Sequence, residues 1–593
     1  MRNFTKRVLF LLLVFVAVSS AFSQDAPDAK SLYTEAMKYV NGDGVDVDVA
    51  KGIELLTKSA SYDYAESYYE LGLIYQKGYH VDVDAVKANE YFFKAAGLGD
   101  VNAMNSIGYA YYNGTGVEQD YTKSYEWFLK SATGGNADSM NRVGLCYLRG
   151  KGVKTDGVNS VIWFRKGAEL GNQQAVYNYA LCIIVGLCDK DLSDSEKFDW
   201  LQKAARGGCT DAQLRLGHLY FNGKGVKQDF KRSLLWFFMG AANGNYEALN
   251  NLSSLIYIGC GTKENSKLAI SLMQISAVKG KNPAAMLNYG RIVIKGIEAP
   301  KDEKLGFDLM VKSAESNDSD AYQEVGELYE KGIGCEKDYD KALYWYSRSV
   351  EQHSQGSDLS AKAIERIHTI QNGGVVQEEP ADDEQQETLK KPQEQDLSLA
   401  KQMYKKGIAY QNGNGVEKDN AKAYDCFCQA AEMGYPDAYM EKGVALFSGI
   451  GVKQDTEECV IAFLNGATAG SDDALFDLAL LLEDGKYIPQ NNDLMDLFLF
   501  TAADNGNGPS CMRLGYNYYV GRGVEKNYEK SFEYTKKAVD VGYMDAVRNL
   551  ACMYEDGVGC TADIDKAIEY FKLDAANGNT NSQEDVDRLT KKK

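Results

Sequence analysis

A short glycine-containing turn recurs along the whole chain at an almost constant interval. The segment NGTGVEQD at residues 113–120 has near copies starting at residues 222, 412 and 520. The first glycines of fourteen such turns follow one another at 36 or 37 residues, with one interval of 81. A period of about 20–50 residues is typical of proteins built from stacked repeats. The 593 residues therefore need not divide into the ~four domains that length alone suggests.

Each repeat predicts two helices joined by the turn. A small residue precedes every turn glycine by six positions and a tyrosine often precedes it by three, which places both on one face of a helix. After the turn, an acidic or amide residue such as Asp120 suits a helix N-cap. The turn glycines are expected to leave the first helix with a positive φ. The most regular of them are Gly114, Gly150, Gly223, Gly332, Gly413, Gly449, Gly521 and Gly557.

All five tryptophans keep the register of the repeat. Four of them lie thirteen residues after their turn glycine, and the fifth lies fourteen after it in a repeat that is one residue longer. A ligand-binding tryptophan would not be expected to recur at one register, whereas a packing residue would. The sequence therefore predicts packing roles for Trp127, Trp163, Trp200, Trp236 and Trp345.

Helix pairs of this kind bury their apolar faces only by stacking on neighbours, so the predicted fold is an all-α solenoid. It has about fourteen helix-turn-helix repeats in two arrays, nine in residues 24–371 and five in residues 397–593. A capping helix is expected from residue 357, and a frayed C-terminal tail is expected at the three final lysines. Residues 372–396 are acidic and glutamine-rich, which predicts a disordered linker and arrays that move relative to each other.

The pattern small-x-x-Tyr-x-x-Gly-x-Gly followed by Asp and Trp, as at residues 108–127 and 326–345, resembles the Sel1-like repeat family. The resemblance covers about residues 30–350 and 397–580. It implies a right-handed superhelix that acts as an adaptor or scaffold for other proteins and has no active site. One branch of the family has cysteine pairs eight apart and an associated penicillin-binding activity. Here only Cys552 and Cys560 have that spacing, and they lie on either side of a turn.

The N-terminus is typical of a cleavable secretory signal over residues 1–23. Arg2, Lys6 and Arg7 precede an apolar run from residue 8 to 18, and Ala21 and Ser23 suit the small-residue positions before the cut. The run is shorter than the ~20 residues of a membrane span. The mature protein is therefore expected without a stable span, secreted or periplasmic. A retained N-terminal segment that tethers the chain to a membrane is the alternative.

Charge and cysteine content exclude two classes of protein. The net charge of -19 argues against a nucleic-acid partner, because phosphate binding needs a basic face. Twelve cysteines are too sparse for a small disulfide scaffold. The local pairs Cys552 with Cys560 and Cys182 with Cys188 remain possible disulfides.

Motifs for catalysis, cofactors and metals are not completed. No turn extends to Gly-x-Gly-x-x-Gly or to a P-loop, and the four histidines lie in different repeats. His80 is expected in a turn and His218 in a helix. We therefore expect a non-enzymatic protein without a cofactor or a metal. A glycan-binding protein or a β-lactamase-like hydrolase of the envelope is the alternative, since forty tyrosines keep glycan contact open.

A column of polar residues is the candidate surface for a protein or peptide partner. Eight positions before the turn glycine, five consecutive repeats carry arginine or asparagine, the least acidic run of an acidic chain: Arg142, Asn178, Arg215, Asn251 and Asn288. These groups can pair with carboxylates and peptide amides, so an extended peptide or an acidic segment fits, and a merely solvated helix face is the alternative. Aromatic residues two before the glycine add anchors or pack on the next repeat: Tyr112, Phe221, Tyr257, Phe447 and Tyr519.

Overall fold

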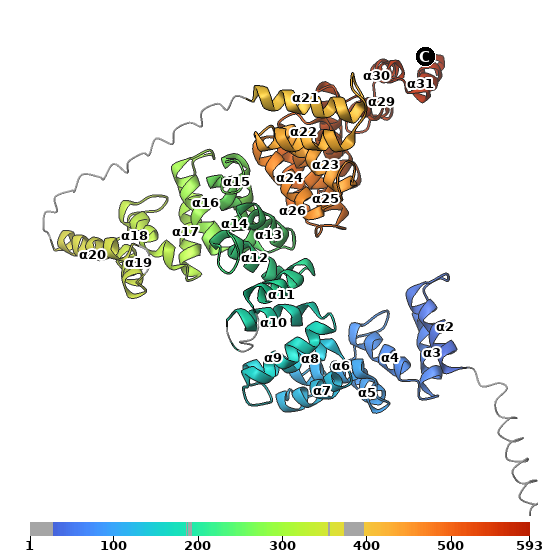
Figure 1. Cartoon of the computed structure of the whole chain (residues 1–593), viewed down its shortest axis with the longest axis vertical. Coiled ribbons are helices and arrows are strands. Elements are labelled where there is room, and N and C mark those ends of the chain that lie inside the picture. The colour runs from blue at the N-terminus through green and yellow to red at the C-terminus, as the bar shows by residue number, and fades with distance from the viewer. Residues whose placement is uncertain (1–27, 186, 188–192, 354–355, 373–396, 593) are drawn as a thin grey trace, which may run out of the picture. The chain divides into compact units, whose positions relative to one another are not determined.

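The glycine turns divide the chain into helices of nearly uniform length. The computed structural model describes residues 28–185, 187, 193–353, 356–372 and 397–592, and within them all regular structure is helical (Figure 1). Most helices have 13 residues, and each turn joins two of them into a pair. The chain is thus an all-α solenoid of repeated helix pairs. The predicted signal at residues 1–23 and all but the first residue of the predicted linker lie outside the described residues.

The chain separates into two compact units, residues 1–209 and 210–593. The helices of the first unit are α2 (Ala29–Asn41), α3 (Val49–Ala60), α4 (Ala65–Lys77), α5 (Ala85–Gly97), α6 (Val101–Asn113), α7 (Tyr121–Thr133), α8 (Ala137–Arg149), α9 (Gly157–Glu169), α10 (Gln173–Ile184) and α11 (Asp194–Arg206).

The second unit holds the remaining repeats of the first array and all of the second array. Its first part consists of α12 (Thr210–Asn222), α13 (Phe230–Ala242), α14 (Tyr246–Ile258), α15 (Ser266–Gln274), η1 (Ile275–Lys279), α16 (Pro283–Lys295), α17 (Glu303–Glu315), η2 (Ser319–Ala321), α18 (Tyr322–Lys331), α19 (Tyr339–Glu351) and α20 (Ser357–Gln371). The capping helix expected from residue 357 is α20. The second array consists of α21 (Ser398–Asn412), α22 (Asn420–Glu432), α23 (Pro436–Ser448), α24 (Thr456–Ala469), α25 (Asp472–Asp484), α26 (Asn492–Asp504), α27 (Gly508–Val520), α28 (Tyr528–Asp540), η3 (Met544–Ala546), α29 (Val547–Asp556), α30 (Ile564–Ala576) and α31 (Thr580–Lys592).

The turn between paired helices has the same construction in each regular repeat. Gly114 ends α6 with φ 72°, and its N–H donates to the carbonyl of Ala110. Asp120 then begins α7, where its carboxylate accepts from the backbone N–H groups of Thr122 and Lys123. Glycine adopts this left-handed conformation without the clash that a Cβ would cause. The local sequence of the turn is therefore enough to end one helix and start the next.

The small residue six before the turn glycine lets paired helices approach closely. A Cβ added to Gly108 of α6 would lie 2.5 Å from Cδ1 of Phe128 in α7. Phe128 is fully buried, and Ser124 of the same helix donates to the carbonyl of Gly108 at 2.8 Å. In other repeats the glycine at this position lies equally close to the side chain twenty residues later, which is phenylalanine, tyrosine or methionine. Gly443 and Phe463 are an example. This contact fixes the geometry of the helix pair.

Helices of the two arrays share one buried core within the second unit. α13 and α24 are buried around most of their circumference, as expected for helices that are apolar all round. The ring centroids of Phe238 and Phe498 lie 6.4 Å apart, and the Asn491 side-chain amide donates to the carbonyls of Ala241 at 3.1 Å and Ala242 at 3.2 Å. These contacts join α13 of the first array to Asn491 and α26 of the second array.

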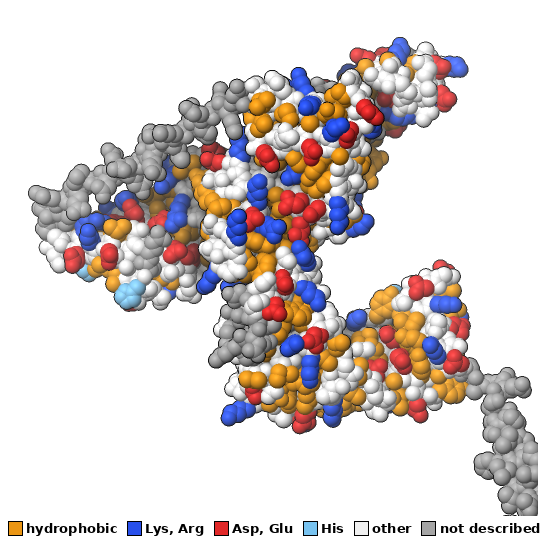
Figure 2. Space-filling view, viewed as in Figure 1, with side chains coloured by type: hydrophobic (Ala, Val, Ile, Leu, Met, Phe, Trp, Pro, Cys, Tyr) orange, Lys and Arg blue, Asp and Glu red, His pale blue; other side chains and the backbone are white. Residues whose placement is uncertain are grey.

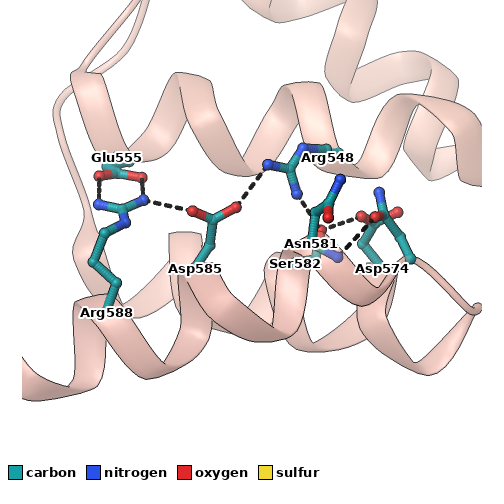
Figure 3. A network of polar contacts seen from close by, with 8 residues as sticks. Arg548, Glu555, Asp574, Asn581, Ser582, Asp585 and Arg588 are labelled. Carbon is teal, nitrogen blue, oxygen red and sulfur yellow. Dashed lines mark hydrogen bonds and ion pairs between the residues drawn. The ribbon is translucent and has the colours of Figure 1, made fainter.

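The C-terminal stretch is a helix, which corrects the expectation of a frayed tail. In α31, Val586 and Leu589 are buried, because they pack on the preceding helices α29 and α30. A polar network joins the same helices (Figure 3): Arg548 donates to the Ser582 hydroxyl at 2.6 Å and to the Asp585 carboxylate at 2.7 Å. Partners 34 and 37 residues away therefore order a segment whose own composition is mostly polar.

Candidate functional site

The candidate column begins in the first unit with Arg142 on α8 and Asn178 on α10. Arg142 is half-buried, and its Nε donates to the hydroxyl of Tyr109 at 2.6 Å. The Tyr109 hydroxyl in turn donates to the Asp138 carboxylate at 2.8 Å. Burial and the neighbouring Asp138 charge raise the pKa of Tyr109 to about 12, so the phenol stays protonated. Asn178 donates to the Asn141 side-chain carbonyl at 2.7 Å.

The column continues in the second unit with Arg215 on α12, Asn251 on α14 and Asn288 on α16. The side-chain amide of Asn251 lies 3.4 Å from Nε2 of His218, and the Asn288 side-chain carbonyl accepts from Arg291 at 3.1 Å. Asn251 and Asn288 are half-buried, whereas Arg215 is exposed.

Two contacts of the column share one register. The residue eight before a turn glycine reaches the residue five before the previous turn glycine where Arg142 contacts Tyr109 and Asn251 contacts His218. The ion pair of Glu324 with Arg291, at 2.9–3.0 Å, has the same spacing. Asn178 and Asn288 contact other positions. In the shared register polar contacts join first helices of neighbouring repeats, and Arg215 is the exposed member of the column.

The second array carries carboxylates at the equivalent register. Glu441 on α23 and Asp477 on α25 occupy the position eight before the turn glycine, and Asp437 and Asp473 lie one turn earlier on the same helices. Burial, with the charges of Asp473 and Glu441, raises the pKa of Asp477 to about 7. Burial also raises the pKa of Glu441, against a hydrogen bond from Gln411. The sequence analysis did not single out this acidic cluster, although two acidic residues one repeat apart, Glu441 and Asp477, were a signal.

The aromatic residues two before the turn glycine differ in exposure. Tyr112 contacts Tyr121 with ring centroids 5.3 Å apart, Phe221 contacts Phe230 at 5.6 Å and Phe447 contacts Tyr487 at 5.3 Å. Those three and Tyr257 are half-buried, whereas 46% of Tyr519 is exposed. Of the five candidates, Tyr519 is therefore the most available to a partner.

The turn glycines have left-handed backbone conformations, and the tryptophans pack against other residues of the repeats. All eight regular turn glycines have φ between 64° and 81°. Trp236 and Trp345 are almost fully buried, and Trp163 packs on the core around Phe128. Trp127 lies 5.8 Å from Phe93 and Trp200 lies 5.2 Å from Tyr179, measured between ring centroids.

Many tyrosines are also covered by neighbours. The tyrosine three before the turn glycine lies under a lysine of the following helix, as with Lys123 at 5.4 Å from the Tyr111 ring and Lys566 at 5.1 Å from the Tyr554 ring. A cation over an aromatic face is attractive. On the face drawn in Figure 2, basic and acidic side chains are interspersed, without one continuous basic patch.

Groups with metal-binding or nucleophilic chemistry are dispersed. In the described ranges, no three His, Cys, Asp or Glu side chains gather in a way that could hold a metal ion. His80 lies in a turn with φ 53°, and His218 lies in α12. Cys552 and Cys560 hold free thiols, and the Cys560 thiol donates to the carbonyl of Met553 at 3.5 Å. The second candidate disulfide involves Cys188, which lies outside the described residues.

The described helices were compared by length and apolar character with what a bilayer span needs. None of those between residues 28 and 592 that the structure describes is both long and apolar enough to cross a bilayer.

Comparison with known families gives one match that runs along most of the chain. The family described as Sel1 repeat matches fourteen segments, at residues 36–61, 65–100, 101–136, 137–172, 173–209, 210–245, 247–280, 283–318, 319–354, 403–435, 436–461, 472–494, 508–543 and 545–579.

Two curated relatives come from yeasts. The chain is 27% identical over 251 residues to Chitin synthase regulatory factor 3 of Schizosaccharomyces pombe, covering 41% of this chain and 26% of that protein. It is 34% identical over 61 residues to Chitin synthase regulator SKT5 of Saccharomyces cerevisiae, covering 10% of this chain and 9% of that protein. The chain thus spans at most about a quarter of these relatives.

Two solved structures are similar to this chain over much of its length. One is c5321 of uropathogenic Escherichia coli, titled a protective antigen displaying an SLR fold, with 23% identity, 91% of this chain and 94% of that chain covered, and a TM-score of 0.31. The other is a Sel1 repeat protein from Oxalobacter formigenes, with 23% identity, 58% and 95% covered, and a TM-score of 0.41. TM-scores below 0.5 do not establish a common overall arrangement.

Proposed function

Because the chain belongs to the Sel1 repeat family, whose repeats serve as protein-interaction scaffolds, we propose that it is an exported, non-enzymatic adaptor for partner proteins or peptides. Stacked repeats create long surfaces on which one register position recurs from helix to helix. The adaptor needs no cofactor and no nucleic acid for this role. Export is supported by the signal-like pattern of residues 1–23.

The polar column is the observation that carries the proposal. In the second unit it runs over α12, α14 and α16, which are first helices of consecutive repeats, and it presents Arg215, Asn251 and Asn288. Guanidinium and amide groups bind carboxylates and peptide groups. An extended segment of a partner, with acidic side chains opposite Arg215, is the ligand that this column fits.

A charge reversal on the column tests the proposal. The purified chain is immobilised, partners are captured from native envelope fractions, and the captured proteins are quantified by mass spectrometry. Arg215→Glu should lower capture of the column-dependent partners at least tenfold, because the column then repels acidic segments. Lys224→Glu is the matched control: it makes the same charge change at an exposed turn residue of the same repeat and should leave capture unchanged. Equal capture by wild type and Arg215→Glu would remove the column from the proposal.

The non-enzymatic part is tested against the alternative of an envelope hydrolase or glycan-binding protein. A chromogenic β-lactam should not be turned over, and a glycan array should show no saturable binding. Turnover that copurifies with the chain would contradict the adaptor role as stated.

Export is tested by the N-terminus of the protein purified from its native host. Cleavage after Ser23 should give a first residue of Gln24 in a soluble secreted or periplasmic fraction. An intact N-terminus in the membrane fraction would favour the membrane-tethered alternative.

A further inference from the structure

One packing position of the repeat is filled by a large residue everywhere except in one repeat. Fourteen residues after the turn glycine stand Leu, Phe, Met or Tyr, and in the repeat with the inserted residue Trp200 stands there, with the buried Leu201 next to it. In the repeat formed by α27 and α28 this position is Thr535. Its hydroxyl donates to the carbonyl of Ser531 at 2.8 Å, so the side chain is satisfied within its own helix.

The missing side chain coincides with a cavity. A crevice of about 290 Å³ opens between α27, α28 and α29, and Gly515 and Thr535 line it. In two other repeats the same register lines a much smaller space. The equivalent crevice holds about 20 Å³ where Phe128 fills it and about 40 Å³ where Phe427 fills it. Replacement of an aromatic ring by threonine is therefore the physical cause of the larger crevice.

The mouth of the crevice is open and aromatic. Tyr516 is 50% exposed and Tyr519 is 46% exposed, and both line the crevice. Met512 and Met553 lie in the same wall. Thioether sulfur and tyrosine rings favour contact with another aromatic ring. Asp556 is the one Asp, Glu, Lys or Arg side chain of the lining, and it is exposed.

We propose that this crevice is a subsite for an aromatic side chain of a partner segment, flanked by a lysine or arginine that pairs with Asp556. The ring takes the space that phenylalanine of the chain itself occupies in other repeats. Buried aromatic anchors in such pockets supply much of the binding energy of protein interfaces. The inference rests on the proposed adaptor function and names the chemistry that one of its repeats recognises.

The position of the crevice agrees with the candidate column. Asn549, which lines the crevice, stands eight before its turn glycine, and Arg142 lines the small equivalent crevice at Phe128. A peptide that follows the column register therefore passes the mouth of this crevice.

The test uses the full chain with methyl-labelled methionine and the probe N-acetyl-Lys-Phe-amide. The probe should shift the NMR signals of Met512 and Met553 in a saturable way. N-acetyl-Lys-Ala-amide should give at least tenfold weaker binding because it lacks the ring, and N-acetyl-Glu-Phe-amide should also bind more weakly because it repels Asp556. The absence of a saturable shift with the Lys-Phe probe up to millimolar concentration would overturn the proposal.

Two variants decide whether the crevice is responsible. Thr535→Phe places in the crevice the residue type found in most other repeats, and it should weaken probe binding at least tenfold without lowering the unfolding temperature. Thr535→Ser should bind like the wild type. If Thr535→Phe does not fold, Tyr519→Ala removes an exposed wall residue instead and should weaken binding in the same way. Undiminished binding by a folded Thr535→Phe or by Tyr519→Ala would overturn the subsite.

Partner capture separates this inference from the adaptor function. Capture that falls with Arg215→Glu but not with Thr535→Phe would reject the subsite and leave the adaptor function standing. Capture that falls with Thr535→Phe supports the subsite. If the chain captures no partner at all, the adaptor function fails, and the inference that rests on it falls too.

Discussion

Substitution of the glycine at the centre of a helix pair offers a test of how the repeats pack. Gly108 lies in the middle of α6, where an added Cβ would be 2.5 Å from Cδ1 and 2.6 Å from Cε1 of Phe128. Phe128 is fully buried, so its ring cannot move away without displacing its neighbours. Gly108→Ala should therefore force the two helices apart.

The size of the effect comes from two opposing contributions. Alanine is favoured over glycine inside a helix by about 1 kcal/mol. Overpacking of a tight core costs about 1–3 kcal/mol, and because the clash is with a ring that cannot move away without displacing its neighbours, the upper part of that range applies. The net destabilisation of the pair α6 and α7 should be about 1–2 kcal/mol.

Gly97→Ala is a control with the same chemistry and the opposite sign. Gly97 is the last residue of α5, and an added Cβ there meets nothing within 4 Å. Only the helix propensity remains, so this variant should be neutral or stabilised by up to about 1 kcal/mol.

Hydrogen exchange followed by mass spectrometry is the suitable assay, because a repeat array opens locally and not as one two-state unit. Amides of α6 and α7 should exchange about five- to thirtyfold faster in Gly108→Ala, which corresponds to 1–2 kcal/mol at about 1.4 kcal/mol per factor of ten. Amides of α5 should exchange no faster in Gly97→Ala. If the amides of α6 and α7 exchange no faster in Gly108→Ala than in the wild type, the close approach of Gly108 to Phe128 does not determine the packing.

Two further predictions concern charge. The pKa of Asp477 is raised to about 7, so the folded state holds this proton more tightly than the unfolded state. The contribution of the protonated carboxyl to stability is full below pH 4 and is lost as the pH rises to about 7. Asp477→Asn should therefore stabilise α25 at pH 8 by about 1–2 kcal/mol after allowance for solvent screening, but not at pH 4, as hydrogen exchange of α25 in variant and wild type at each pH can show. Arg548→Ala removes the donors to Ser582 and Asp585 and should speed exchange of α31 about tenfold, whereas Lys591→Ala, at an exposed residue of the same helix, should not.

The helix pairs could be predicted from the sequence because their signals are local. Gly114 ends a helix and Asp120 begins the next through contacts within a few residues. The position of the first helix relative to the second follows from one small residue and one aromatic residue twenty positions apart, as Gly108 and Phe128 show. Fourteen copies of these signals made the period and the fold class unambiguous.

The C-terminal helix was missed because its partners are distant in sequence. Residues 580–593 are rich in polar residues, and their two buried apolar residues, Val586 and Leu589, are a weak signal alone. The helix depends on Arg548 and on Glu555, which accepts from Arg588 at 2.9 Å. The packing between helices of the two arrays had a clearer signal in the sequence. The runs LLWFF in α13 and VIAFL in α24 leave no polar face for solvent, which is typical of helices that are buried on all sides.

The candidate column was found by register, but its internal contacts could not be. Whether Arg142 is free depends on the residue five before the previous turn glycine, and there the chain has Tyr109, next to Asp138. Arg215 occupies the same register and is exposed. Charge reversal at Arg215 therefore reports on partner binding, whereas the same change at Arg142 would also break a contact between repeats.

A repeat protein lets each position be judged against its own column, and this is the basis on which Thr535 is informative. A threonine in a helix is unremarkable alone. At this register, however, most other repeats have a phenylalanine, and the crevice beside Thr535 has a volume of about 290 Å³. Filling a cavity is one of the common routes to added stability, so a chain that keeps this crevice forgoes stabilisation that a phenylalanine provides in other repeats. Departures from the repeat that cost stability are expected where a surface binds something. The stability of Thr535→Phe therefore bears on the proposal as directly as its binding. An unfolding temperature that is unchanged or raised, together with weakened probe binding, is the combination expected of a binding crevice. A fall in both would mean that Thr535 is needed for packing.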